Sequence, residues 1–313
     1  MPEPSPTPRR RGRLLRFGAA FVVLLAVAGY LVVQYVTGGA GAPGCKVVSA
    51  EDDGAAYEFT PEQAVNAATI AAVGTGRDLP ERAVTIALAT ALQESALRNI
   101  DHGDRDSLGL FQQRPSMGWG TEKEIMDPTY SAGIFYDHLV KVDDYTKLPL
   151  TVAAQRVQRS GFPDAYAKHE PDAALLAAAL TGRSAATLTC EGRPDTTRVA
   201  GTDPVRTALA RDFGRDVLEP AGAVVGGADS ASAAPSAESG GRTLTLPVAE
   251  NAEGWQLAHW AVANASALRI ERVSYAGREW TAGNTDSQWR AVGSEGAAGA
   301  EKGTGSVRIV TAQ

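Results

Sequence analysis

The chain has 313 residues, enough for one or two folded domains and additional non-globular segments. Its formal net charge is −6, but residues 1–16 carry five arginines against one glutamate, so the remaining residues carry a net charge of −10. Binding to nucleic acid through its phosphates needs a basic surface, and an acidic body of this kind argues against a nucleic-acid partner.

An uncharged apolar stretch follows the arginine-rich N-terminus. Residues 17–36 number twenty, about the length of a helix that spans a bilayer. The arginines should stay on the cytoplasmic side, which predicts a cytoplasmic basic tail over 1–16, a single transmembrane helix over 17–36 and an extracytoplasmic body held at the cell membrane. A cleaved signal peptide with its cleavage site among the small residues 38–42 is the alternative, and it would give a secreted protein.

Residues 37–58 are interpreted as a stalk, and helical patterns begin at Phe59. Thr60 offers an N-cap and Pro61 a first-turn proline, and later prolines precede further apolar patterns with helical spacing. The predicted helices start at Pro61, Pro80, Pro128 and Pro149, and an Ala-rich helix covers 173–180. We therefore expect residues 59–190 to form an all-α domain.

The pattern changes towards the C-terminus. Residues 191–220 form a connecting region with a helix predicted over 203–213, and 221–241 is rich in Gly, Ala and Ser, as in a flexible linker. Residues 242–313 are expected to be a small α+β domain, with β segments at 243–248, 270–280 and 306–310 and a helix at 255–268. The whole chain is thus predicted to be mainly α.

The two cysteines, Cys45 and Cys190, bracket the predicted helical domain. Cysteines of an exported chain tend to persist as a disulfide, and closing a loop of 145 residues could stabilise the fold by up to ~5 kcal/mol. The alternative interpretation is two unrelated buried thiols.

One carboxylate stands out at the end of a predicted helix. Glu94 shares a helix side with the small residues Ala83, Ala87, Thr90 and Ala91, which predicts an accessible cleft beside it. Partial burial would raise the pKa of Glu94 towards neutrality, as a general acid requires. An ordinary solvated helix glutamate is the competing interpretation.

The sequence around this glutamate resembles a known family. Gln93-Glu94-Ser95, followed by Gly109-Leu110-Phe111-Gln112, is similar to the soluble lytic transglycosylases, which have a lysozyme-like fold, and the resemblance covers 61–171. It implies that Glu94 protonates the glycosidic oxygen between N-acetylmuramic acid and N-acetylglucosamine of peptidoglycan. It further implies that Ser95 is an orienting hydroxyl and that Gly109, Leu110, Phe111 and Gln112 hold an acetamido sugar. We expect no cofactor and no bound metal.

The flanking residues look like the actinobacterial form of this family, with 104–107 before the turn and 113–115 and 118–120 after it. Trp119 is expected either to stack on a sugar face or to anchor its loop. Such enzymes use the same glutamate as base and leave a 1,6-anhydro sugar, unlike the two-carboxylate scheme. Asp101, Asp104 and Asp106 leave a hydrolytic, lysozyme-like outcome open; their spacing does not match a Ca²⁺-binding EF-hand loop.

The chain departs from the family in a third motif. Where the family usually has Ala-Tyr-Asn-Ala-Gly, with a tyrosine that hydrogen-bonds the catalytic acid, this chain has Val157 at the tyrosine position and Gln158 beside it. Tyr166 follows a few residues later and is the alternative source of the phenol, and both Gln158 and Tyr166 are candidate substrate-binding residues.

The C-terminal segment faintly resembles a domain related to zinc-dependent D-Ala-D-Ala carboxypeptidases. Zinc needs about three protein ligands, and this segment has only His259, so we interpret it as a non-catalytic part with a binding or spacing role towards the wall. His138 and His169 are isolated, and no Gly-x-Ser-x-Gly elbow supports a Ser-His-Asp site.

Two functions remain open from the sequence. The first is cleavage of peptidoglycan glycan strands by Glu94; the second is a non-catalytic wall-binding or scaffold protein that keeps the fold. Transport of solutes or metals is disfavoured, because one spanning helix cannot enclose a pathway.

Overall fold

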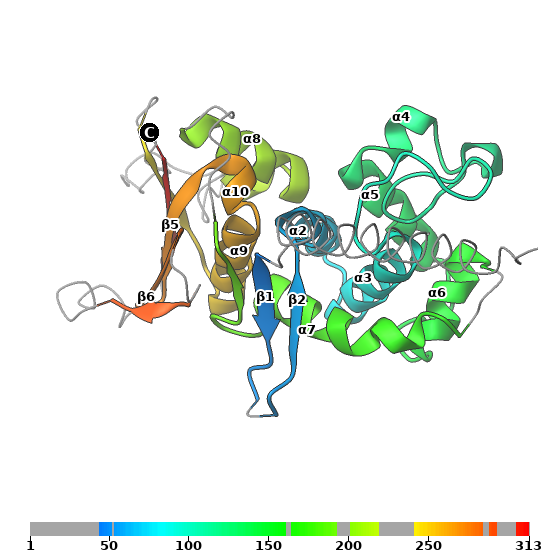
Figure 1. Ribbon diagram of the computed structural model, residues 1–313, viewed down its shortest axis with the longest axis horizontal. Helices are drawn as coiled ribbons and strands as arrows, with labels where there is room; N and C mark the ends of the chain where they lie inside the picture. The colour runs from blue at the N-terminus through cyan, green and yellow to red at the C-terminus, as the bar shows by residue number, and fades with distance from the viewer. Residues whose placement is uncertain are drawn as a thin grey trace, which may run out of the picture. The chain divides into compact units, whose positions relative to one another are not determined.

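The computed structural model describes residues 44–51, 53–160, 164–192, 201–218, 241–283, 288–292 and 305–312 (Figure 1). The predicted basic tail over 1–16, the predicted transmembrane helix over 17–36 and residues 221–240 of the predicted linker lie outside these described residues. None of the helices in the described ranges is both long enough and apolar enough to cross a membrane.

Helices dominate the segment from residue 59 to residue 190. The first helix begins with a capping box, in which Thr60 Oγ1 accepts from the Gln63 N–H while Gln63 Oε1 accepts from the Thr60 N–H. The helices here are α2 (Pro61–Thr75), α3 (Glu81–Ser95), α4 (Glu122–Ile125), α5 (Pro128–Leu139), α6 (Leu150–Gln158) and α7 (Glu170–Leu180), with 3-10 turns η2 (Pro115–Met117) and η3 (Ala167–His169). The segment is mainly α, but the prediction of an all-α domain is wrong at its ends, where Phe59 and Leu188–Cys190 belong to strands.

Helix α3 packs closely against α7 through small side chains. Ala83, Ala87 and Ala91 of α3 are 0 % exposed, as are Ala173 and Ala177 of α7. Small residues allow two helix backbones to approach closely. The prediction that these alanines border an accessible cleft is therefore wrong, because the helices packed around α3 bury them.

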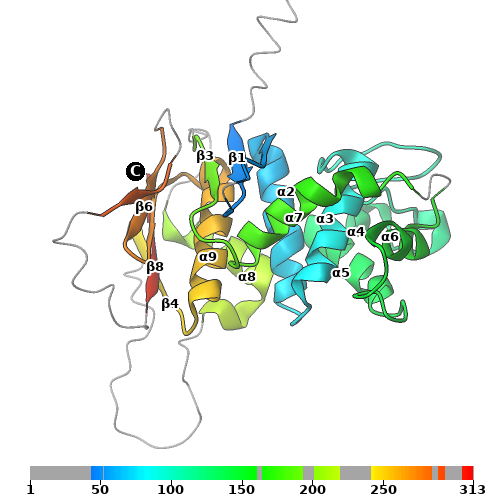
Figure 2. The ribbon, with the colours of Figure 1, turned by 90° about the horizontal axis from the view of Figure 1, so that it is seen from below.

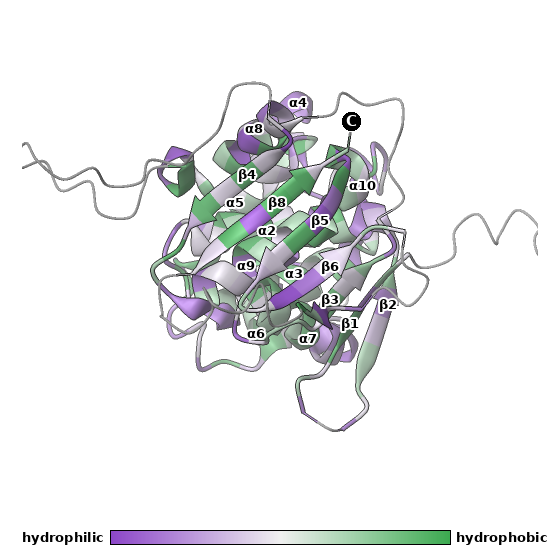
Figure 3. Ribbon diagram, turned by 90° about the vertical axis from the view of Figure 1, so that its left-hand side faces the viewer, coloured by the Kyte–Doolittle hydropathy of each residue, from purple (hydrophilic) through white to green (hydrophobic). Residues whose placement is uncertain are grey.

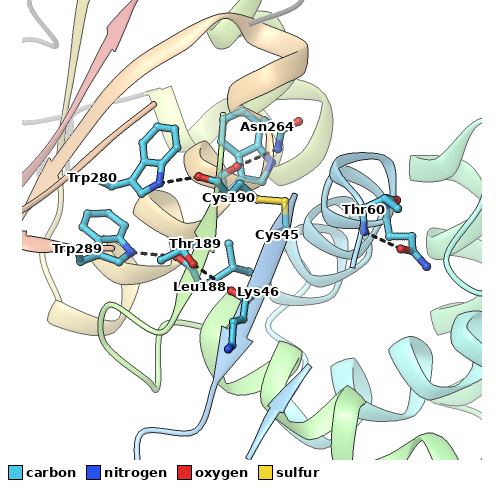
Figure 4. Close-up of a disulfide and its surroundings, with 11 residues drawn as sticks. Cys45, Lys46, Thr60, Leu188, Thr189, Cys190, Asn264, Trp280 and Trp289 are labelled. Atoms are coloured by element: carbon cyan, nitrogen blue, oxygen red, sulfur yellow. Dashed lines mark hydrogen bonds between the residues drawn. A yellow bond between two sulfur atoms is a disulfide. The ribbon is translucent and has the colours of Figure 1, made fainter. Parts of the chain in front are cut away.

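A small antiparallel sheet lies at the start of the described chain. It contains β1 (Cys45–Val48), β2 (Ala56–Phe59) and β3 (Leu188–Cys190) in the order β2-β1-β3. The prediction of a stalk over 37–58 is wrong for β1 and for most of β2. The register places Cys45 opposite Cys190, and the predicted disulfide joins them (Figure 4).

The C-terminal segment forms a second antiparallel sheet in the order β4-β8-β5-β6-β7 (Figure 3). What was predicted as one β segment over 270–280 is a hairpin, since Ala276 and Gly277 have positive φ and form its turn. The elements are α8 (Thr202–Phe213), η4 (Arg215–Leu218), β4 (Thr243–Pro247), α9 (Asn251–Ala263), α10 (Ala265–Leu268), β5 (Ile270–Tyr275), β6 (Arg278–Thr281), β7 (Arg290–Ala291) and β8 (Ser306–Thr311). The described residues are therefore mainly α-helical, with two small antiparallel sheets.

Helix α9 lies between the second sheet and the N-terminal helices (Figure 2). It packs against β5 and β8 on one side and against α2, α7 and β3 on the other. The described residues, all of which follow Ala42, belong to one compact unit. The predicted helical domain and the predicted C-terminal α+β domain therefore share a buried interface.

Buried polar contacts cross this interface. The indole Nε1–H groups of Trp280 and Trp289 donate to the carbonyls of Cys190 and Leu188, at 3.0 and 2.9 Å, so these two tryptophans of the C-terminal segment bind the backbone of β3 (Figure 4). The buried carboxylate of Asp212 in α8 accepts from Trp260 Nε1 at 2.9 Å and from Thr69 Oγ1 at 3.2 Å. These contacts tie α2, α8 and α9 together.

Candidate active site

Glu94 lies in the last turn of α3 and is half-buried. The helix ends directly after it, because Ala96 and Leu97 both adopt left-handed backbone conformations, with φ of 53° and 58°. Two consecutive left-handed residues turn the chain away from the helix axis. The carboxylate thus stands at a helix end rather than along a covered helix side.

The phenol of Tyr166 donates a 2.7 Å hydrogen bond to Glu94 Oε1. Tyr166 precedes η3 and is 0 % exposed, so its ring is fixed in the core while its hydroxyl reaches the carboxylate. Val157, which the sequence resemblance aligns with a motif tyrosine, is buried in α6. The structure brings Tyr166, and not a residue of the motif position, to Glu94.

Burial raises the pKa of Glu94 above its usual value, while hydrogen bonds from Tyr166 and Gln158 act in the opposite direction. Burial disfavours the charged form of a carboxyl group, and donated hydrogen bonds favour it. The net direction is upward, as a carboxyl group that has to carry a proton near neutral pH requires. The pKa of Tyr166 is also raised, by burial first and by the neighbouring Glu94 second.

The predicted sugar-side turn is a tight hairpin joined to the end of α3. Leu108 and Gln113 pair across it through two backbone hydrogen bonds, Leu108 N–H to Gln113 O and the reverse. Ser95 Oγ donates to the Leu110 carbonyl at 2.8 Å, so the residue after Glu94 holds the turn in place. The predicted orienting hydroxyl of Ser95 thus acts on the backbone of the turn.

Glycine at position 109 is required by its surroundings. Its φ is 73°, and a Cβ at this position would lie 2.8 Å from the Ile125 carbonyl oxygen. Leu110 and Phe111 are 0 % exposed, and Phe111 stacks on Phe135. Their side chains belong to the core, so a ligand at this turn would meet the backbone and the half-buried side chain of Gln112.

The acidic loop before the turn is occupied by its own contacts. Asp106 accepts from Arg114 Nε and from the Ser116 N–H, both at 2.8 Å, and these donors hold its pKa well below the usual value. Asp101 is exposed and lies 2.9 Å from His102 Nδ1. Both oxygens of Asp106 are committed to the loop, which leaves it poorly placed to act as a second catalytic carboxylate or as a Ca²⁺ ligand.

Trp119 stacks on His138, with ring centroids 4.4 Å apart, and its carbonyl accepts from the Tyr130 hydroxyl. The indole is half-buried, so one of its faces is taken by His138. Loop anchoring, one of the two expectations for Trp119, agrees with these contacts.

The contact between His169 and Gln93 was not predicted from the sequence. His169 Nε2 lies 3.2 Å from Gln93 Oε1, which joins η3 to the end of α3 beside the Tyr166–Glu94 hydrogen bond. His169 stands three residues after Tyr166, and this spacing on a helical turn was the available signal.

A cavity of about 300 Å³ lies away from Glu94 and is lined by Arg77, Leu79, Tyr136, Asp137 and Val140.

His259, the single histidine of the C-terminal segment, is 0 % exposed. Its Nδ1–H donates to the Ala179 carbonyl at 2.8 Å, and Nε2 accepts from the Thr187 N–H at 3.2 Å. Both ring nitrogens are therefore bonded to backbone, and burial lowers the pKa of His259 to about 4. This histidine stabilises the interface and is not free to bind zinc.

Comparison with known families gives one match. A family model described as VldE, C-terminal domain, matches residues 202–302, less than half of the chain. The described part of this region contains α8 to α10 and β4 to β7, and it lies apart from Glu94 in the sequence. No curated protein matches the chain.

Proposed function

We propose that the protein cleaves the glycosidic bond between N-acetylmuramic acid and N-acetylglucosamine in peptidoglycan, with Glu94 as the acid and then the base. The observation that carries the proposal is the half-buried Glu94 at a helix end, hydrogen-bonded by the buried Tyr166. The turn formed by 109–112 is fastened to the residue after Glu94. The arrangement supplies a proton donor and an adjoining backbone surface for an acetamido sugar.

The reaction requires Glu94 to carry a proton when substrate binds. Glu94 gives this proton to the glycosidic oxygen as the bond from that oxygen to C1 of the muramyl residue breaks. The same carboxylate then takes the proton of the muramyl C6 hydroxyl, whose oxygen bonds to C1. The products are a free 4-hydroxyl on N-acetylglucosamine and a 1,6-anhydro muramyl end, so no water is consumed.

The acid and base roles make opposite demands on Glu94. Burial favours the protonated carboxyl of the resting state, and the hydrogen bonds from Tyr166 and Gln158 favour the carboxylate that forms in the first step. A single carboxyl group placed between these influences can both lose and regain a proton. This balance favours the single-glutamate scheme over a hydrolytic scheme with a second carboxylate, since Asp106 is held by Arg114 and Ser116.

The proposal places the helical segment 59–190 in a lysozyme-like fold outside the membrane. The disulfide between Cys45 and Cys190 suits an exported protein, because such bonds persist in oxidising compartments. Anchorage by 17–36 in the cell membrane would hold the enzyme beside its polymeric substrate. The C-terminal α+β segment has a binding or spacing role in this proposal.

The test is digestion of purified peptidoglycan by the full-length protein. We expect anhydromuropeptides from wild type and none from Glu94→Gln, while Glu122→Gln, which changes an exposed glutamate of α4, retains the activity. Products with reducing ends would show a hydrolytic, lysozyme-like reaction instead. No products from any variant, with binding to the wall intact, would overturn the enzymatic proposal and favour the non-catalytic wall-binding alternative.

A further inference from the structure

Gln158 stands between the candidate acid and the sugar-side turn. Its amide Nε2–H donates to the Phe111 carbonyl at 2.7 Å, and the same side chain is near enough to Glu94 to lower the pKa of that carboxyl. A side-chain amide nitrogen carries two hydrogens, so one residue can serve both acceptors. The Tyr166 hydroxyl donates a hydrogen bond to the Glu94 carboxylate.

The position of Gln158 is set by the end of α6. Gln158 is the last residue of that helix, and Arg159 after it has a left-handed backbone with φ of 53°. Val157 and Ala154 on the same helix are buried, and α6 packs against both α3 and α5. The amide therefore extends from a fixed helix end and not from a flexible loop.

We propose that Gln158, whose amide already bonds the Phe111 carbonyl, gives its second amide hydrogen to Glu94. It is then a positioning residue that holds the acid and the sugar-side turn at a fixed separation. The inference rests on the proposed function and assigns a role to this residue within it. Gln158 reaches the site because α6 ends there. Gln158 donates a hydrogen bond but exchanges no proton.

The electrostatic consequence has a definite sign. Charged and titratable groups on the elements around Glu94 are Tyr166, Lys168, His169, Glu170 and Asp172 near η3 and α7, Arg156 and Arg159 at the end of α6, and Arg98, Asp101, His102, Asp104, Arg105 and Asp106 between α3 and the turn. A donated hydrogen bond stabilises the ionised carboxyl, so removing it raises the pKa of Glu94. The acid then stays protonated to a higher pH.

The variant that tests the proposal is Gln158→Met in the full-length protein, which keeps a similar length and loses the amide. We expect cleavage of peptidoglycan to fall roughly 10- to 100-fold, as for loss of one hydrogen bond to a charged group. In a plot of cleavage rate against pH, the fall on the alkaline side should move to higher pH. The matched control is Gln155→Met on the same helix, because the Gln155 amide donates to the Ser160 carbonyl instead, so this alkaline fall should stay in place.

A second measurement does not depend on catalysis. In wild-type protein, NMR signals of the Gln158 side-chain amide should follow the titration of the Glu94 carboxyl carbon with the same midpoint, and this midpoint should rise in Gln158→Met. The proposal is overturned if the amide signals do not follow Glu94, or if the folded variant leaves the midpoint unchanged. Because this titration is independent of peptidoglycan cleavage, an inactive protein whose amide does follow Glu94 would refute the proposed function alone.

Discussion

The hydroxyl of Tyr166 lies 2.7 Å from Glu94 Oε1, although the two residues are 72 positions apart in the chain. The sequence motif to which this segment was compared has a tyrosine at the position of Val157, whose side chain here is buried in α6. The chain thus retains a phenol on the candidate acid while supplying it from another segment. Loss of the motif tyrosine from the sequence is therefore not loss of the contact.

Replacement of Tyr166 by phenylalanine tests the importance of this contact. Tyr166→Phe removes a donor to Glu94, so the pKa of Glu94 should rise and the rate of peptidoglycan cleavage at the optimum should fall about 10- to 100-fold. The measurement is the pH dependence of the cleavage rate. Tyr145→Phe, at a half-buried tyrosine after α5, is the control and should retain the wild-type profile.

Much of the helical part could be predicted from local signals. Pro61, Pro80, Pro128 and Pro149 each lie within one residue of an observed helix start, and Glu94 was expected at a helix end. These features depend on backbone caps and on proline geometry, which act over a few residues. The sequence is therefore informative where the determinants are local.

The features that were missed depend on contacts between distant segments. Strand β1 contains only four residues and becomes a strand by pairing with β2 and with β3, whose residues begin at Leu188. The ridge of Ala83, Ala87 and Ala91 looked accessible because helical spacing says which residues share a face, and it does not say which helix covers that face. Contacts of this range have no local pattern to reveal them.

A pH dependence of stability should follow from Glu94. Its pKa in the folded protein is raised above the value of an unfolded chain, so the native state binds more protons than the unfolded state between the two values. The contribution of Glu94 to the free energy of unfolding is complete below its pKa in the unfolded chain. This contribution is lost as the pH rises through its pKa in the folded protein. Urea unfolding at a series of pH values should show Glu94→Gln gaining stability relative to wild type as the pH rises from about 4, near the unfolded value of a glutamate.

The exposed Glu122 provides the comparison for that series. Glu122→Gln should run parallel to wild type, because the side chain lies at the surface of α4. A constant difference between Glu94→Gln and wild type at all pH values would show that burial does not perturb the Glu94 carboxyl.

The buried His259 should give a pH dependence of opposite sign. Burial lowers its pKa to about 4, so below pH ~6.5 the unfolded state binds the proton that the native state excludes. Stability should fall as the pH drops from ~6.5 towards the folded pKa, by roughly 3 kcal/mol in all. His259→Gln should flatten this part of the urea-unfolding series, although it lowers stability at neutral pH by disturbing the bonds to Ala179 and Thr187. An unchanged acid slope would contradict a neutral buried imidazole.

The disulfide should stabilise the fold by restricting the unfolded chain. It links residues separated by 145 positions, and the chain-entropy relation assigns up to about 5 kcal/mol to a loop of this length. We expect Cys45→Ala/Cys190→Ala to lose about 2–5 kcal/mol in urea unfolding, and wild type under reducing conditions to match it. Thiol alkylation without prior reduction, together with an intact mass that reduction leaves unchanged, would show that the bond does not form.

The carboxylate of Asp212 should couple the N-terminal helices to the C-terminal segment. It is 3 % exposed and accepts from Arg211 Nε at 2.7 Å, from Trp260 Nε1 at 2.9 Å and from Thr69 Oγ1 at 3.2 Å. Asp212→Ala leaves the buried indole N–H without its acceptor, and we expect a loss of about 3–5 kcal/mol, whereas Thr69→Val, which removes a single neutral donor, should lose about 1 kcal/mol. Urea unfolding should be followed by far-UV circular dichroism and by tryptophan fluorescence, because four of the five tryptophans lie in the C-terminal segment and the dichroism is dominated by the helices. Both signals should shift together, since Asp212 joins α8 to α2 and α9. A shift of the fluorescence midpoint alone would mean that the C-terminal segment unfolds separately from the helices that carry Glu94.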